Sequence, residues 1–323
     1  MSQILPSGNQ SLSKQDAAGI KKTLDDALLL PIKSNPYTAQ ITRDSPSAFL
    51  FLIDQSGSMA EHLIYNGEKI SKADAVAKII NKLLYDIINR CKKAEGIRDY
   101  FDIALIGYGG NSAHSANLLW DGNLVGRDWV SVSELDQNYL SKEDVIIEKV
   151  IRGVVKHSSE SVKSWIKPLA KYRTPMKPAL QMAHTLIGEW IANHSNVVCF
   201  PPVIMNITDG AVTDATEEEV IQEARLIEQL HTPDGNVLLM NIHISDKTGD
   251  AVLFPANSTQ LSKNNYAKFL YDLSSELPVV FHKEIAAFKN SDIASKYVAM
   301  AFNADMAALI QILNIGTATS KSV

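Results

Sequence analysis

The chain has 323 residues, of which 46% are hydrophobic and 21% are charged, and its formal net charge at pH 7 is −5. This composition is that of an ordinary soluble globular protein, and the acidic balance argues against nucleic acid or an anionic membrane as a partner. The sequence contains no uncharged apolar run near the roughly 20 residues that cross a bilayer, and residues 1–10 do not resemble a secretory signal. Cys91 and Cys199 are too isolated for a disulfide framework or a zinc site. We therefore expect a cytoplasmic protein without membrane insertion.

A helix is predicted near the start of the chain, over residues 13–30. Its apolar residues recur at helical spacing, namely Ala17, Ile20, Leu24, Ala27 and Leu28. The segment 33–36, Lys-Ser-Asn-Pro, ends the helix, so we expect residues 1–35 to form an N-terminal helical arm and linker. Two interpretations stay open. The arm packs on the surface of the domain that follows, or it docks a partner or a second copy of the chain.

The next stretch combines a buried strand with an oxygen-rich loop. Residues 48–53 are all apolar, which is typical of a strand buried on both faces of a parallel sheet. Asp54, Ser56 and Ser58 alternate on the loop that follows, and Gly57 lets the backbone bend so that their side chains can converge. Hard oxygen donors suit Mg²⁺, Mn²⁺ or Ca²⁺ rather than zinc. Taken alone, the pattern also fits a turn in which these side chains hydrogen-bond their own backbone.

Two later stretches add oxygen-bearing residues. Thr174 stands at a position typical of a helix N-cap, with Pro175 as the first helical residue, so simple capping would explain it. Residues 203–208 predict a second buried strand, and Asp209 follows it as Asp54 follows the first. Because capping accounts for Thr174 alone, we favour a common metal site formed by all three loops.

The remaining chain alternates between strand and helix patterns. Ser71 and Asp74 are expected to cap a long helix with a complete apolar stripe, which ends in basic residues and Gly96. The run 107–110 lacks the spacing of nucleotide-binding glycine loops and is expected to be a turn. The other predicted elements are strands at 101–108, 116–120, 237–244 and 297–301, a helix after a capping box of Thr216 and Glu219, a turn at Asp234-Gly235, helices at 266–274 and around Ile285, and a last helix at 304–313 between Asn303 and Gly316.

An insertion is expected at about 121–172. Its segment 145–155 is rich in β-branched residues, which favours a strand, but its apolar residues also recur at helical spacing. Both interpretations stay open. Because the insertion leads directly into Thr174, it would either shape the surface beside the metal site or form a peripheral hairpin that covers a sheet edge.

Together these residues resemble the metal-ion-dependent adhesion site of von Willebrand factor type A domains, which combines D-x-S-x-S, a distant Thr and a later Asp. The resemblance covers roughly residues 36–317 and is greatest to intracellular bacterial members. Arg173 stands where such proteins commonly carry Gly. The matching stretches are Leu52-Ile53-Asp54-Gln55-Ser56-Gly57-Ser58-Met59, Thr174-Pro175-Met176, Pro201-Pro202-Val203, Ile207-Thr208-Asp209-Gly210, Asp234-Gly235-Asn236-Val237-Leu238-Leu239 and Phe302-Asn303-Ala304-Asp305.

The resemblance implies a single domain over 36–317, followed by a tail at 318–323. It also implies that Ser56, Ser58 and Thr174 bind Mg²⁺ or Mn²⁺ directly, with Ca²⁺ as a further candidate, while Asp54 and Asp209 act through water or orient the hydroxyls. The alternation of strands and helices predicts a doubly wound α/β fold, with a mainly parallel central sheet flanked by helices on both faces. The family places its first and fourth strands side by side, where the strand order reverses and a ligand crevice opens.

The function expected from this site is metal-dependent protein–protein interaction rather than catalysis. Neutral hydroxyl ligands keep the cation electrophilic, and an octahedral cation with an open position would accept an Asp or Glu carboxylate from a partner. Such a chain would serve as an adaptor or scaffold in a bacterial signalling or stress-response system. Relatives are often encoded near protein kinases, metal-dependent phosphatases or AAA-type ATPases, which makes these enzymes candidate partners by analogy.

Two alternatives remain. A metal-dependent hydrolase or phosphatase would use the cation and Asp54, but the sequence has no D-x-D, H-x-H, H-E-x-x-H or G-x-S-x-G pattern at the expected places. His62 is the candidate base for that reading, and it is more simply explained as a surface residue. The third reading is a structural domain with a vestigial site. The presence of all five site positions argues against it.

Overall fold

The computed structural model describes residues 14–65, 68–151, 154–210, 212–244, 251–261 and 265–304. Within these ranges the core is one sheet of eight strands, whose main path runs β15-β16-β14-β11-β1-β6-β7. Its five central strands are parallel, and the edge strands pair antiparallel with β16 and β6. The strands are β1 (Ser47–Gln55), β6 (Phe101–Gly109), β7 (Ala116–Leu118), β8 (Val130–Ser131), β11 (Val203–Thr208), β14 (Leu238–Ile244), β15 (Val252–Leu253) and β16 (Met300–Ala304).

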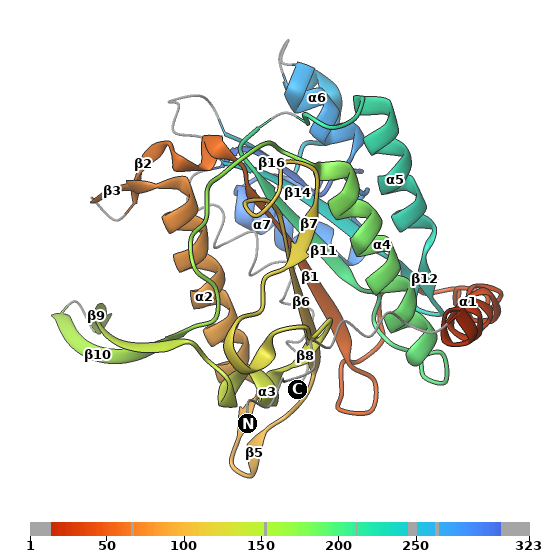
Figure 1. Cartoon of the computed structure of the whole chain (residues 1–323), viewed down its shortest axis with the longest axis horizontal. Coiled ribbons are helices and arrows are strands. Elements are labelled where there is room, and N and C mark those ends of the chain that lie inside the picture. Colours follow the sequence, from red (N-terminus) through yellow and green to blue (C-terminus); the bar gives the residue numbers. More distant parts are fainter. Residues whose placement is uncertain are drawn as a thin grey trace, which may run out of the picture.

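Helices cover both faces of this sheet, which confirms the predicted doubly wound α/β architecture (Figure 1). One face packs against α2 (Lys72–Cys91), α3 (Val132–Gln137) and α7 (His282–Lys289). The other packs against α1 (Lys14–Leu28), α4 (Met176–Asn193), α5 (Glu217–Gln229) and α6 (Asn265–Asp272). None of the helices in the described ranges combines the length and apolar character needed to cross a bilayer.

The first strand shows why the fold has two cores. Along β1, Phe49, Phe51 and Ile53 join the core on the α2 face. The alternate residues, Ala48, Leu50 and Leu52, join the core on the α4 face. The prediction of a strand buried on both faces is thus confirmed. Burial of each large apolar side chain contributes about 1.5–3 kcal/mol relative to exposure, so this strand anchors both layers.

A buried polar network fixes how three strands line up. Tyr108 Oη on β6 donates to Asn206 Oδ1 on β11 at 2.8 Å. Asn206 Nδ2 donates to Asn241 Oδ1 on β14 at 2.9 Å, and Asn241 Nδ2 donates to Ser274 Oγ at 3.0 Å. Tyr108, Asn206 and Asn241 are fully buried. Because an unpaired buried polar group costs about 1–3 kcal/mol, a slip of one strand against another would be penalised at each of these side chains.

The N-terminal helix and the segment after it pack on the domain. Leu24 Cδ2 lies 3.0 Å from the position that a Cβ at Gly188 of α4 would occupy. Further along, the buried Asp234 carboxylate accepts the N–H groups of Thr38 and Ala39 at 3.0 Å each and pairs with Lys33 Nζ at 2.5 Å. These contacts support packing of the arm on the domain's own surface.

In the insertion, the segment that fitted both a strand and a helix belongs to two strands. It contains a 3₁₀ turn η2 (Gly122–Leu124), β8 and α3, and then β9 (Ser141–Ile151) and β10 (Val154–Ser164), which pair antiparallel. In Figure 1 this hairpin projects from the body beside α2. In the described part it forms its own two-stranded sheet rather than extending the central one. Trp165 anchors its base, because its indole N–H donates to Leu135 O at 2.9 Å.

Some predicted boundaries are wrong. Gly96 does not close α2, which ends at Cys91 with Lys92 as its C-cap. It lies instead in a short hairpin of two strands, β4 (Lys92–Lys93) and β5 (Gly96–Ile97). The last strand starts at Met300 rather than residue 297, and it includes Asn303 and Ala304, so Asn303 does not cap a helix there. The rest of the predicted last helix, Gly316 and the tail at 318–323 lie outside the described residues.

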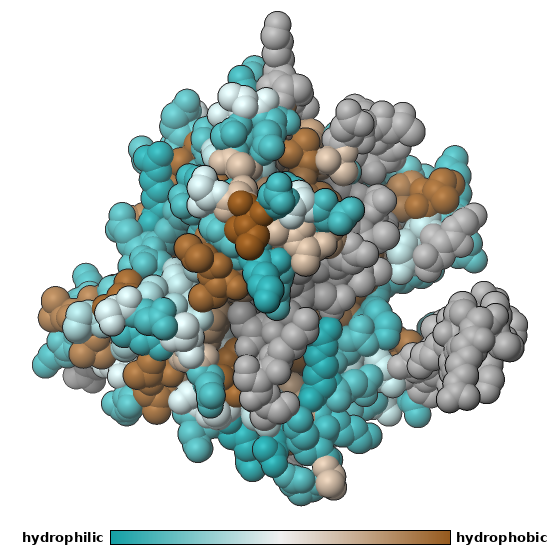
Figure 2. Space-filling model, turned by 180° about the vertical axis from the view of Figure 1, so that it is seen from behind, coloured by the Kyte–Doolittle hydropathy of each residue, from teal (hydrophilic) through white to brown (hydrophobic). Residues whose placement is uncertain are grey.

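The other predicted strands and helices are confirmed with shifts of a few residues at their ends, whereas several short elements were not predicted. The Thr216 and Glu219 capping box opens α5 as expected, and Ser71 accepts from the Asp74 N–H at the start of α2. Apolar side chains that remain exposed form small groups among hydrophilic ones on the face seen in Figure 2. The short elements are η1 (Gly57–Ala60), β2 (His62–Tyr65), β3 (Glu68–Ser71), β12 (His231–Thr232), β13 (Gly235–Asn236), η3 (Ser258–Leu261) and η4 (Val279–Phe281).

Candidate metal site

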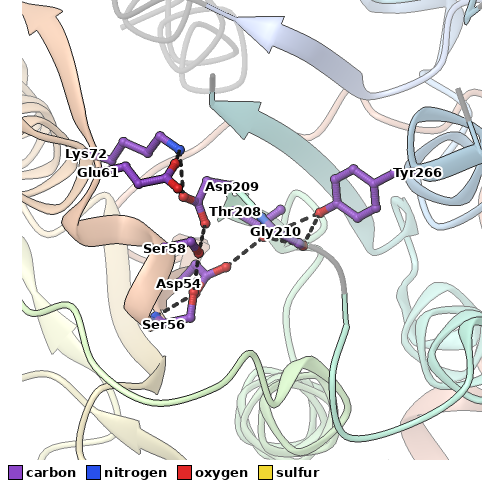
Figure 3. Close-up of polar contacts among 9 residues, drawn as sticks. All are labelled: Asp54, Ser56, Ser58, Glu61, Lys72, Thr208, Asp209, Gly210 and Tyr266. Atoms are coloured by element: carbon purple, nitrogen blue, oxygen red, sulfur yellow. Dashed lines mark hydrogen bonds and ion pairs between the residues drawn. The ribbon is translucent and has the colours of Figure 1, made fainter. Parts of the chain in front are cut away.

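The loops after β1 and β11 meet because these two strands are parallel neighbours, with Ile53 opposite Ile207. Their carboxyl ends therefore lie at the same edge of the sheet, where the strand order reverses. Ser58 Oγ donates to Asp209 Oδ1 at 2.7 Å across the gap between the loops. Ser56 Oγ and Ser58 Oγ lie 3.0 Å apart (Figure 3). The structure thus brings four of the five expected residues into one hydrogen-bonded group.

Asp54, which is buried at the end of β1, supports this group through hydrogen bonds. Its side chain is buried, Oδ1 accepts the Ser56 N–H at 2.8 Å, and Oδ2 accepts the Thr208 hydroxyl at 2.8 Å. Burial raises the pKa of Asp54 to about 6, although the hydrogen bonds from Ser56 and Thr208 act in the opposite direction. With both oxygens engaged, Asp54 is placed to orient the serine loop rather than to point into the open face of the site.

Thr174 approaches the same place from a third loop. Gly210 lies between the loops: a Cβ there would stand 3.5 Å from Ser58 Oγ and 3.7 Å from Thr174 Oγ1. The Thr174 N–H donates to Thr213 Oγ1 at 2.9 Å, and the Thr213 N–H donates back to Thr174 O at 3.3 Å. These reciprocal bonds tie the Thr174 loop to the loop that carries Asp209.

Helix capping, the simpler explanation weighed for Thr174 against metal binding, is not what the structure shows. The helix starts at Met176, the capping position is held by Pro175, and that residue has φ −79° and ψ 72°, which is not helical. Asp214, from the loop after β11, lies near this helix end: burial raises its pKa, while the backbone N–H groups of Met176 and Lys177 lower it. Capping therefore no longer accounts for the hydroxyl of Thr174.

The glycine run at the end of β6 holds the two ligand loops together. Gln55 O accepts N–H bonds from Gly110 at 3.0 Å and from Lys171 at 2.7 Å. Gly109 has φ +90°, and a Cβ there would lie only 2.7 Å from Arg173 O and 2.9 Å from Ser56 N. Residues 107–109 belong to β6, so only the end of the run is the predicted turn. The glycines at the end of β6 let three backbone segments come close together, namely their own, that of Ser56 and that of Arg173.

Arg173 itself is exposed, and its carbonyl, not its side chain, makes the close approach to Gly109. This explains how the Thr174 loop accommodates a large residue where a glycine is common in the family it resembles.

Lys72 is a member of the site that sequence reasoning missed. Its ammonium lies 3.0 Å from Asp209 Oδ2 and 2.7 Å from Glu61 Oε2 (Figure 3). Its side chain is 4% exposed, whereas that of Glu61 is 61% exposed. Burial lowers the pKa of Lys72, but the hydrogen bonds and charges of Glu61 and Asp209 outweigh it and raise that pKa. A lysine in the first turn of a helix, where the dipole disfavours a cation, was the available signal.

Tyr266 is a second missed residue. It comes from α6, its hydroxyl donates to Gly210 O, and it lies 3.5 Å from Thr208 Oγ1, the group that supports Asp54. His62, the candidate base, lies exposed at the start of β2.

The donor set suits a small, hard cation. Magnesium–oxygen bonds of 2.0–2.1 Å place neighbouring ligands of an octahedron about 2.9–3.0 Å apart. The 3.0 Å between Ser56 Oγ and Ser58 Oγ matches that edge. Among the described residues no group of three or more His, Cys, Asp or Glu side chains could hold a metal. The hydroxyls of Ser56, Ser58 and Thr174, which the carboxylates support, fit such a cation by their chemistry.

Comparison with known proteins gives only distant similarities. The chain matches no protein family model and no curated protein. Among solved structures it is similar to a von Willebrand factor type A protein from Catenulispora acidiphila, with 12% identity and a TM-score of 0.41, over 86% of this chain and 43% of that one. It is also similar to the corresponding domain of the type V pili tip protein Mfa5 from Porphyromonas gingivalis, with 17% identity and a TM-score of 0.29, over 52% of this chain and 39% of that one.

A third similarity is to an uncharacterised membrane-spanning protein from Vibrio fischeri, with 15% identity and a TM-score of 0.22, over 86% of this chain and 100% of that one. The chain thus spans about two fifths of the first two proteins.

Proposed function

We propose that this chain is a von Willebrand factor type A domain that acts as a metal-dependent protein-interaction module. It would serve as an adaptor or scaffold in the cytoplasm of a bacterium, in a signalling or stress-response system. The observation that supports this most is the meeting of Ser56, Ser58 and Thr174 from two loops, with the buried carboxylates of Asp54 and Asp209 behind them.

In this proposal Ser56, Ser58 and Thr174 bind Mg²⁺ or Mn²⁺, and Ca²⁺ is a further candidate. Asp54 and Asp209 hold the serine hydroxyls in place through the contacts described above. The cation, when bound, supplies an electrophilic centre with a position open to an Asp or Glu carboxylate of a partner protein. Protein kinases, phosphatases and AAA-type ATPases are the candidate partners.

We favour binding over catalysis because of how the carboxylates are held. Both oxygens of Asp54 accept hydrogen bonds, and Asp209 is bonded to Ser58 through one oxygen and to Lys72 through the other. Neither carboxylate is presented as a nucleophile. Hydrolysis of generic phosphate esters that depends on the cation and is abolished by Asp54→Asn would overturn this choice.

The proposal is tested by thermal unfolding in EDTA and in excess Mg²⁺ or Mn²⁺. A cation at about 100 times its dissociation constant adds about 2.7 kcal/mol to the stability, which corresponds to an increase of about 5 to 10 °C in Tm for a domain of this size. The increase should disappear in a Ser56→Ala, Ser58→Ala double variant and persist in Ser258→Ala, which removes an exposed serine elsewhere. Equal Tm values in EDTA and in excess cation for the wild type would support a vestigial site instead.

A further inference from the structure

Lys72 is placed against the preference of its own helix. It is the first residue of α2, the end at which the helix dipole favours anions. Its ammonium is nevertheless buried there, and its contacts to Asp209 and Glu61 compensate for the loss of water. A position that is unfavourable for the helix and satisfied by a site carboxylate points to a role in the site.

The ammonium changes the charge that the site presents. Asp54 and Asp209 are the buried carboxylates behind the hydroxyls, and Lys72 offsets one of their two negative charges. Glu61 pairs with the same ammonium, but it lies largely in solvent, which reduces the effect of its charge on the site without abolishing it. A divalent cation held by the three neutral hydroxyls would therefore keep a positive charge in excess. Without Lys72, the two carboxylates alone would balance it.

The ammonium also fixes how Asp209 is used. Lys72 Nζ lies at Oδ2, while Oδ1 accepts the Ser58 hydroxyl at 2.7 Å. Asp209 is therefore held as a support for Ser58, and it cannot turn its second oxygen toward the cation without losing the contact to Lys72. Both effects act in the same direction, since they weaken the hold of this chain's own residues on a cation.

We propose that Lys72 makes tight cation binding conditional on an external carboxylate, so that the cation and an acidic partner bind cooperatively. This inference rests on the proposed metal-dependent function and names the residue that sets the requirement for an anionic ligand. Removal of the ammonium produces a site that binds the cation tightly by itself and gains little from a carboxylate.

The test measures the dissociation constant of Mn²⁺ by calorimetry in sodium chloride and in sodium acetate of equal ionic strength, with acetate as the carboxylate probe. For the wild type, acetate should tighten Mn²⁺ binding severalfold. For Lys72→Met, binding in chloride should be at least about tenfold tighter than for the wild type, because a like charge near the cation is gone, and acetate should add little. Comparison between variants removes the effect of acetate on free Mn²⁺.

Three further variants separate charge from structure. Lys72→Arg keeps the charge and should behave like the wild type. Lys82→Met removes a lysine that pairs with Asp86 on the same helix, away from the site, and should also leave both constants unchanged. Glu61→Gln should weaken Mn²⁺ binding in chloride and enlarge the acetate effect, so it tests the inference even if Lys72→Met does not fold.

The outcomes distinguish this inference from the function on which it rests. Equal dissociation constants and equal acetate effects in the wild type, Lys72→Met and Glu61→Gln would overturn the role of Lys72 and leave the metal site standing. Tighter binding in Lys72→Arg as well would show that the charge is not the cause and would overturn it too. Absence of Mn²⁺ binding in every variant, with or without acetate, would overturn both.

Discussion

Substitution of Gly109 tests whether the site depends on close backbone approach. Gly109→Ala places a methyl group where the backbone has φ +90°, and a left-handed conformation costs an L-residue about 1–2 kcal/mol. The methyl carbon would lie 2.7 Å from Arg173 O and 2.9 Å from Ser56 N, and relief of such overlap costs about 1–3 kcal/mol. The expected loss of stability is therefore about 2–5 kcal/mol. Since Ser56 and the residue before Thr174 must move, Mn²⁺ affinity should fall as well.

A matched control separates the two contributions. Gly126 has φ +80°, and nothing lies within 4 Å of the position of its Cβ, so Gly126→Ala should lose only the conformational part, about 1–2 kcal/mol, and keep its Mn²⁺ affinity. Urea unfolding measures the stability of both variants, and calorimetric titration measures Mn²⁺ binding. Equal losses of stability, together with unchanged Mn²⁺ affinity in Gly109→Ala, would refute the view that this glycine holds the two ligand loops together.

Three other predictions concern the framework of the site. Asn206→Leu leaves Tyr108 Oη without its acceptor and should lower the free energy of unfolding by about 1–3 kcal/mol, which urea unfolding would measure. A loss below the error of that measurement would contradict the role of the network. Asp234→Ala removes the acceptor of the Thr38 and Ala39 N–H groups and should raise the rates of hydrogen exchange and proteolysis around residues 33–39. Unchanged rates there would contradict the view that Asp234 holds the linker on the domain. Burial raises the pKa of Asp102. The folded protein therefore loses stability as pH rises and this carboxyl group ionises. Asp102→Asn should be more stable than the wild type at pH 7, but not at a pH below the ordinary pKa of an aspartate.

Part of this fold could be predicted from the sequence because the signals are local. An unbroken apolar run before Asp54 is enough to predict a strand buried on both faces, and a second such run before Asp209 predicts its partner. The expected sheet order places these two strands side by side. The parallel pairing of β1 with β11 confirms this expectation. The capping box at Thr216 and Glu219 is local in the same sense.

The rest depends on contacts between segments far apart in sequence. Lys72 and Tyr266 reach the site from α2 and α6, and neither side chain is marked by a neighbouring motif. The glycines at the end of β6 are explained only by the loops that pass over them. Thr174 looks like a helix cap in the sequence because Pro175 follows it, but Pro175 holds the capping position and the backbone of Thr174 is bonded to Thr213. Residues 145–155 fit both periodicities, and pairing of β9 with β10 decides between them.

The most direct measurement of the central claim is anomalous diffraction at the manganese edge from crystals grown or soaked in Mn²⁺. The account predicts a single strong anomalous peak between Ser56, Ser58 and Thr174, within coordination distance of the two serine hydroxyls, and no peak there in the Ser56→Ala, Ser58→Ala double variant. Mn²⁺ bound only elsewhere, or no anomalous peak between these three residues at saturating Mn²⁺, would contradict it.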